Sequence, residues 1–115
     1  MSYVAPTAKV SGHAQVLDDA IVWDHAQVTG NAMVWGHAVV CDNAQVSDNA
    51  IVSGASKVFG DAMVFGDAVV GGNAHVYGNA HVSGTAVVEG QSILEGDVAI
   101  SSGHIRNVHW WRDVP

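Results

Sequence analysis

One six-residue unit repeats almost from end to end of this 115-residue sequence. Its first position holds Val4 and then a Val at every sixth residue to Val88, followed by Leu94 and Ile100, so 17 consecutive hexads keep one register. The fifth position holds Ala in most hexads, and the repeat fails at Arg106. A short repeat without insertions is typical of a solenoid, in which each unit stacks on its neighbours to bury one continuous core.

Each hexad predicts one short strand and one corner. The Ala-x-Val triplet has a period of two, so Ala and Val point to the same side, as in a strand. The third position is Gly or Asp from Gly12 to Gly96, and the fourth is mostly Asn, Asp or His. These residue types best tolerate left-handed backbone angles, which favours a corner there. We therefore expect an all-β prism with Ala and Val inside.

This pattern resembles the bacterial hexapeptide-repeat proteins over about residues 3–104. The resemblance implies a single-stranded left-handed parallel β-helix of triangular cross-section, with three hexads per coil and between five and six coils. The usual Gly directly after the aliphatic residue is absent, and Gly or Asp stands one place later, as in very regular bacterial and prophage members. We expect residues 1–104 to form the β-helix and residues 105–115 a C-terminal capping tail.

The composition agrees with a narrow solenoid interior. Val contributes 21 and Ala 16 of the 56 apolar residues, whereas a conventional core contains more Leu, Ile and Phe. Larger side chains would not fit where three walls converge.

Apolar residues that point outward predict an interface. At 18 residues per coil, Met33, Ile51, Val69 and Val87 form a vertical stripe on the third wall, and contiguous exposed apolar surface marks interaction sites. Many hexapeptide-repeat proteins are obligate trimers, so the resemblance implies a homotrimer. The interface candidates are Leu17, Ile21, Met33, Trp35, Val39, Ile51, Val69 and Val87. The alternative is that these are ordinary surface residues of a β-rich protein.

Aromatic and histidine side chains on two walls are candidates for ligand binding. Trp23, Phe59 and Tyr77 form a ladder on the first wall, interrupted by Cys41, and a planar ligand or a protein partner could stack there. His75 and His81 point outward from adjacent walls and no repeat position requires them.

The C-terminal tail has two alternative roles. Its candidate residues are Arg106, His109, Trp110, Trp111 and Arg112. The aromatic rings could cover the last coil, because solenoid ends expose unpaired strand edges. Alternatively, Arg and Trp together could form a small anion or nucleobase site.

The resemblance also implies enzymatic alternatives. Many hexapeptide-repeat proteins are acyltransferases that use acetyl-CoA or acyl carrier protein, and His75 or His81 would then be the general base. Those enzymes commonly use an inserted loop and basic residues to hold the acyl carrier, whereas this chain has no insertion and only Lys9 and Lys57 within its coils. A carbonic anhydrase of the γ class would need three converging His on zinc, and no such ligand motif is present. We expect no metal and no cofactor.

The charge balance excludes one class of partner. Four Lys and Arg residues against 11 Asp and Glu argue against nucleic-acid binding, which depends on cations at phosphates. The lone Cys41 excludes an intramolecular disulfide and fits a reducing compartment. No apolar run reaches membrane-spanning length, so we expect a cytoplasmic protein of a bacterium or a phage-infected cell, without a membrane partner.

These observations favour a non-enzymatic homotrimeric binding protein, bacterial or phage-encoded. It would capture a small molecule or a host protein in grooves between subunits. The alternatives are an acyl-CoA-dependent acyltransferase and a structural spacer that stacks end to end.

Overall fold

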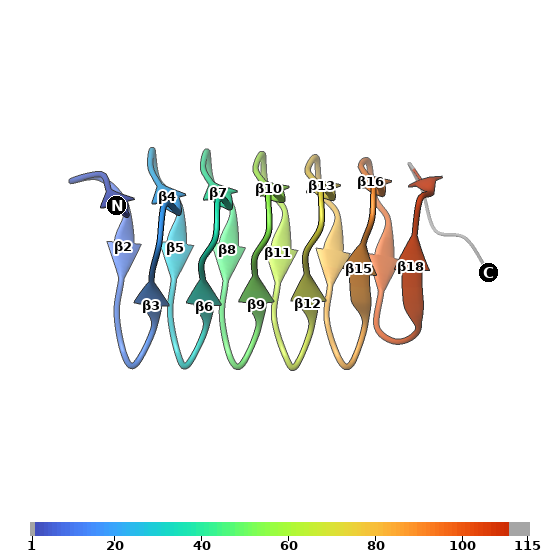
Figure 1. The fold of residues 1–115 in the computed structure, drawn as a ribbon, viewed down its shortest axis with the longest axis horizontal. Helices are drawn as coiled ribbons and strands as arrows, with labels where there is room; N and C mark the ends of the chain where they lie inside the picture. Colours follow the sequence, from blue (N-terminus) through green and yellow to red (C-terminus); the bar gives the residue numbers. More distant parts are fainter. Residues whose placement is uncertain (1, 111–115) are drawn as a thin grey trace.

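Nineteen strands of two or three residues follow one another, without a helix between them, in residues 2–110, the part of the chain that this computed structural model describes (Figure 1). Successive strands lie on successive walls, so each coil contributes one strand to each of three parallel sheets. The coils follow one another along the long axis, from β2 near the N-terminus to β18 near the C-terminus (Figure 1). The fold is a three-sided parallel β-helix of about six coils, as predicted.

The three walls have the strand orders that an 18-residue coil requires. Within the described residues, the first wall contains β1 (Tyr3–Val4), β4 (Ile21–Val22), β7 (Val39–Val40), β10 (Lys57–Val58), β13 (His75–Val76), β16 (Ile93–Leu94) and β19 (His109–Trp110). The second contains β2 (Lys9–Val10), β5 (Gln27–Val28), β8 (Gln45–Val46), β11 (Met63–Val64), β14 (His81–Val82) and β17 (Ala99–Ile100). The third contains β3 (Gln15–Val16), β6 (Met33–Val34), β9 (Ile51–Val52), β12 (Val69–Val70), β15 (Val87–Glu89) and β18 (His104–Arg106).

The core is the inward column of Val and Ala that the repeat predicts. From Ala20 to Val88, every Ala and Val at the inward hexad positions is fully buried, and Leu94 is the largest fully buried side chain. Ser56 and Ser92 replace inward Ala, and their hydroxyls donate to the carbonyl oxygens of Ser53 and Glu89 at 2.7 and 2.9 Å. The two polar groups are thereby satisfied inside an apolar interior.

The corners place the left-handed backbone on the third hexad position. Gly54 has φ of 66° and Asp48 has φ of 59°, and the same sign recurs at each third position from Gly12 to Gly96. A Cβ on Gly54 would lie 2.8 Å from the backbone nitrogen of Gly72 in the next coil. Glycine therefore permits both the positive φ and the close approach of stacked corners.

Aspartate at the third position bonds to the next coil. The carboxylates of Asp18, Asp42 and Asp48 accept hydrogen bonds from backbone N–H groups at distances of 3.2, 3.0 and 3.1 Å; the donors are Gly36, Gly60 and Gly66. These hydrogen bonds link successive corners along the solenoid.

The fourth position forms a polar ladder along one corner. The Asn31 amide donates to Asn49 at 3.3 Å, and the Asn49 amide donates to Asp67 at 3.2 Å. These fourth-position residues connect coils through their side chains rather than through a left-handed backbone.

The last described coil is shorter than the others. In β18, Ile105 lies opposite Val88, and in β19, Trp110 lies opposite Leu94. These partners are 17 and 16 residues apart instead of 18, because each of the last two corners lacks one residue. Residues 105–110 thus continue the coil in a shifted register, and the division of the chain at residue 104 stays a prediction.

Candidate functional site: an aromatic groove on the first wall

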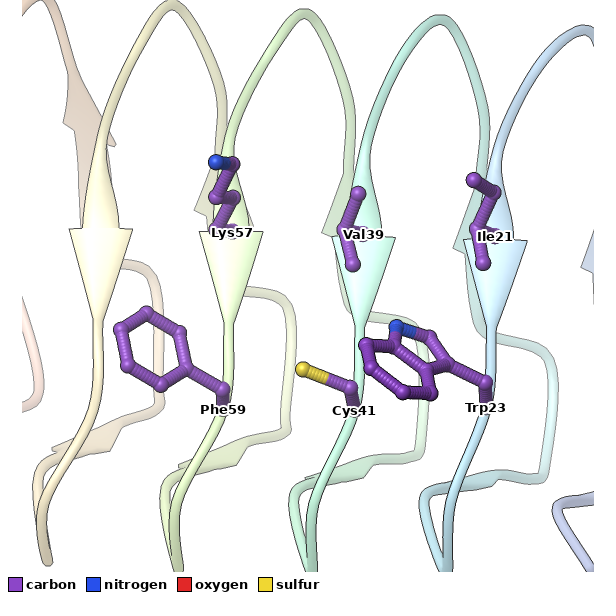
Figure 2. Close-up of a pocket in the computed structure, with 6 residues that line it drawn as sticks. All are labelled: Ile21, Trp23, Val39, Cys41, Lys57 and Phe59. Atoms are coloured by element: carbon purple, nitrogen blue, oxygen red, sulfur yellow. The ribbon is translucent and has the colours of Figure 1, made fainter.

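A groove of about 440 Å³ lies on the first wall, across β4, β7 and β10 (Figure 2). Two rows of side chains line it. Ile21, Val39 and Lys57 form the strand row, and Trp23, Cys41 and Phe59 form the aromatic row, which begins two residues later in each coil. The parallel register places Val39 between Ile21 and Lys57. The lining is mostly apolar, and Lys57 is the one charged residue in it.

Cys41 interrupts the aromatic row. Trp23 and Phe59 flank it on the preceding and following coils, and Figure 2 shows the short thiol side chain between the two rings. Phe59 stacks on Tyr77 of the next coil, with centroids 4.7 Å apart and planes 8° apart. The predicted ladder is therefore continuous from Phe59 to Tyr77 and open at Cys41.

The Cys41 thiol is not an activated nucleophile. Burial first, and then the neighbouring carboxylates of Asp42 and Asp24, raise its pKa to about 11 against the opposing effect of Lys57. A thiol with this pKa is protonated at neutral pH. Cys41 therefore acts in the groove as a small apolar side chain.

Lys57 has no ion-pair partner among the residues that the structure describes. Its side chain is exposed, and it lies between Val39 and His75 of the neighbouring strands on the first wall. The groove therefore has one cationic end.

Tyr77 links the aromatic row to the last coil. Burial raises the pKa of Tyr77, and its hydroxyl also bonds to the Glu95 carboxylate. His109 bonds to the same carboxylate and, with Tyr77, lowers the pKa of Glu95. The Tyr77–Glu95–His109 network continues the aromatic row to β19.

The two histidine candidates are not among the groove-lining residues, although His75 is the neighbour of Lys57 on the next coil. His75 is half-buried in β13 of the first wall, and exposed His81 lies in β14 of the second wall. The His81 ring meets Phe65 edge to face, with centroids 6.5 Å apart. The structure places the two imidazoles on different walls.

The tail candidates that the structure describes contact residues of the preceding coil. Arg106 donates to the Glu89 carboxylate at 2.8 Å, and His104 bonds to the same carboxylate. Half-buried Trp110 packs against the core. Trp111 and Arg112 lie outside the described residues.

Sequence reasoning missed part of this site. Cys41 and Lys57 were not among its candidate site residues, and Ile21 and Val39 were assigned to an interface, although all four line the groove. The available signal was the 18-residue register, which places these side chains beside Trp23 and Phe59. Glu89 and Glu95 were also missed, because their partners depend on the shifted last coil.

The interface candidates form the predicted stripe. Met33, Ile51, Val69 and Val87 are in-register neighbours on the third wall, and all four are half-buried in the single chain. At the edges of this wall, Leu17 and Trp35 are 41% and 39% exposed.

Among residues 2–110, no group of three or more His, Cys, Asp or Glu side chains is arranged to hold a metal ion. In the same part of the chain, no helix has the length and hydrophobicity to cross a membrane.

Comparison with protein families supports the solenoid assignment. Residues 44–58 and 56–72 match the model of the YdcK β-solenoid repeat. This similarity and the parallel coils confirm the predicted hexapeptide-repeat-like β-helix. Searches of curated proteins and of solved structures gave no match.

Proposed function

We propose that this protein is a non-enzymatic binding protein that holds a small molecule in the groove on its first wall. The observation that carries this proposal is the groove itself, where Trp23, Cys41 and Phe59 lie beside an aliphatic row. Apolar concavities with a few polar groups are the usual form of small-molecule sites. The coils hold the lining in place through backbone bonds, such as Trp23 N–H to the Val40 carbonyl at 3.0 Å.

The proposal includes self-association through the third wall. Ile21 and Val39 belong both to the groove and to the predicted interface, so a copy seated on the third wall would lie at one edge of the groove. A homotrimer would then present three such grooves near its subunit boundaries. We place this assembly in the cytoplasm of a bacterium or a phage-infected cell, where a lone Cys41 is compatible with a reducing environment.

Native mass spectrometry of protein purified from its native cell tests this function. We expect a retained small molecule that disappears in Phe59→Ala and persists in Phe65→Ala. Both Phe residues follow a strand and are half-buried, but they lie on different walls, so the pair is a matched control.

Three results would contradict the proposal. Equal retention by both Phe variants would place the ligand elsewhere. Turnover of acetyl-CoA that is lost in His75→Ala or His81→Ala would identify an acyltransferase. End-to-end filaments without any retained molecule would identify a structural spacer.

A further inference from the structure

We propose that the groove selects a planar aromatic compound with an anionic substituent, which contacts Trp23 and Phe59 over Cys41 and places its anion at Lys57. This inference rests on the proposed binding function and specifies its ligand class. It follows from the missing ring in the aromatic row, the size of the hollow and the charges at its two sides.

The missing ring defines the apolar part of the ligand. Successive coils lie about 4.8 Å apart, and Phe59 and Tyr77, one coil apart, bring their ring centroids to 4.7 Å. Trp23 and Phe59 are two coils apart, and the intervening Cys41 leaves their facing sides without an aromatic neighbour (Figure 2). A ligand ring over Cys41 would contact both side chains, and each aromatic pair contributes about 0.5–1.5 kcal/mol beyond buried area.

The hollow limits the ligand to a small molecule. A volume of about 440 Å³ lies near the lower end of the range for small-molecule sites, roughly 300–1,000 Å³. The groove spans three coils, which suits a ligand with a single ring or two fused rings. A flat body also suits a lining that contains two aromatic side chains.

Charge fixes the orientation and sign of the substituent. Lys57 lies in the strand row and has no ion-pair partner among residues 2–110. The carboxylates of Asp24 and Asp42 follow the aromatic row, at the corner on the opposite side from the strand row, and both act on the Cys41 thiol. An anionic substituent is therefore attracted toward Lys57 and repelled from the corner. His75, the neighbour of Lys57 on the next coil, can add an N–H donor to the same anion.

Three naphthalene probes of similar shape test the assignment by titration calorimetry: 2-naphthoate, neutral 2-naphthalenemethanol and cationic 2-naphthylmethylammonium. We expect the wild-type protein to bind naphthoate most tightly and the cation most weakly. Lys57→Gln should weaken naphthoate binding about 2- to 5-fold, as expected for loss of one exposed charge pair, and leave the neutral probe unchanged. Lys9→Gln on the second wall is the matched control and should change neither.

Filling the gap provides an independent test. Cys41→Phe supplies the missing ring and should abolish binding of both naphthoate and the neutral probe, while circular dichroism confirms that the β-helix remains. A second variant, Cys41→Ser, keeps the hollow and should retain both.

The outcomes separate this inference from the function on which it rests. Equal binding of the three probes, with loss in Cys41→Phe, would overturn the anionic assignment and leave the groove as a ligand site. Naphthoate binding that survives Cys41→Phe would overturn the placement over Cys41. If none of the three probes binds, the proposed ligand class is wrong. Loss of a natural ligand in Phe59→Ala would still support the proposed function.

Discussion

The Phe59 ring stacks on the Tyr77 ring of the next coil, with centroids 4.7 Å apart and planes 8° apart. Neither residue belongs to the Val and Ala core, so this contact stabilises the outside of the first wall. The coil spacing of a β-helix, about 4.8 Å, is close enough for rings in successive coils to stack. A row of outward positions can thus become either a continuous ladder or, where one ring is missing, a groove.

Removal of this stack should destabilise the solenoid modestly. Tyr77→Leu should lower the free energy of unfolding by about 0.5–1.5 kcal/mol, because it removes one aromatic pair. Tyr77→Phe keeps the stack and should have a smaller effect, which separates the ring from its hydroxyl bond to Glu95. Urea denaturation measures these differences, with Tyr3→Leu at the exposed N-terminal strand as a control. Equal losses for Tyr77→Leu and Tyr3→Leu would show that the stack contributes nothing.

Corner glycines should resist substitution where coils approach closely. At Gly54, a Cβ would meet the Gly72 backbone at 2.8 Å and the backbone has φ of 66°, so Gly54→Ala should destabilise by at least about 1 kcal/mol. Gly71→Ala is the matched control, since Gly71 has no left-handed φ and its Cβ would meet only Ser53 Oγ at 3.4 Å. Thermal denaturation should give a clearly lower melting temperature for Gly54→Ala than for Gly71→Ala. The reverse order would contradict the assigned role of the corner.

The sequence predicts the regular coils well because one register determines both faces of each strand. Met33, Ile51 and Val69 become neighbours simply by being 18 residues apart. The register does not predict the last coil, because Ser101, Ser102 and Gly103 form a shorter corner that does not follow the hexad pattern. The loss of one residue there moves Ile105 into the column where the 18-residue register would place Arg106.

The candidate site was only partly predictable for a related reason. The positions of Trp23 and Phe59 follow from the register, but the hollow between them depends on the size of the Cys41 side chain and on how the rings lie. The Glu89–Arg106 ion pair and the contact of Glu95 with His109 depend on the shifted last coil. The repeat ends before this coil, so it cannot predict which side chains pair across the shortened corners.

The Glu89–Arg106 ion pair makes the C-terminal coil sensitive to acid. Arg106 and then His104 hold the pKa of the Glu89 carboxyl below its ordinary value of 4.5. The lowered folded-state pKa means that this contribution is present above about pH 4.5 and is lost as the pH falls through the folded pKa. The protection factors of the amides of residues 104–110, which correct the exchange rates for their intrinsic pH dependence, should therefore fall below pH 4.5 in the wild type. Glu89→Gln should show less of this acid dependence, whereas Asp61→Asn, in the middle of the solenoid, should retain it.

The Cys41 thiol should react slowly with alkylating agents. Its pKa of about 11 leaves little thiolate at neutral pH, so the rate with iodoacetamide should rise about tenfold per pH unit from pH 7 to 10. Asp42→Asn removes one of the carboxylates that raise this pKa and should increase the rate at pH 8. The Asp67→Asn variant removes a corner carboxylate on another edge of the prism and is the control. A rate that is already independent of pH at neutrality would contradict the assigned state of the thiol.

The apolar stripe on the third wall should control self-association. Val69 lies between Ile51 and Val87 in this stripe, so Val69→Asp would place a charge at the centre of the proposed interface. We expect light scattering to show a trimer for the wild type and a monomer for Val69→Asp. Met63→Asp is the matched control, because Met63 is also half-buried and points outward from a central strand, but on the second wall. A wild-type monomer, or dissociation by Met63→Asp alone, would contradict the third wall as the interface.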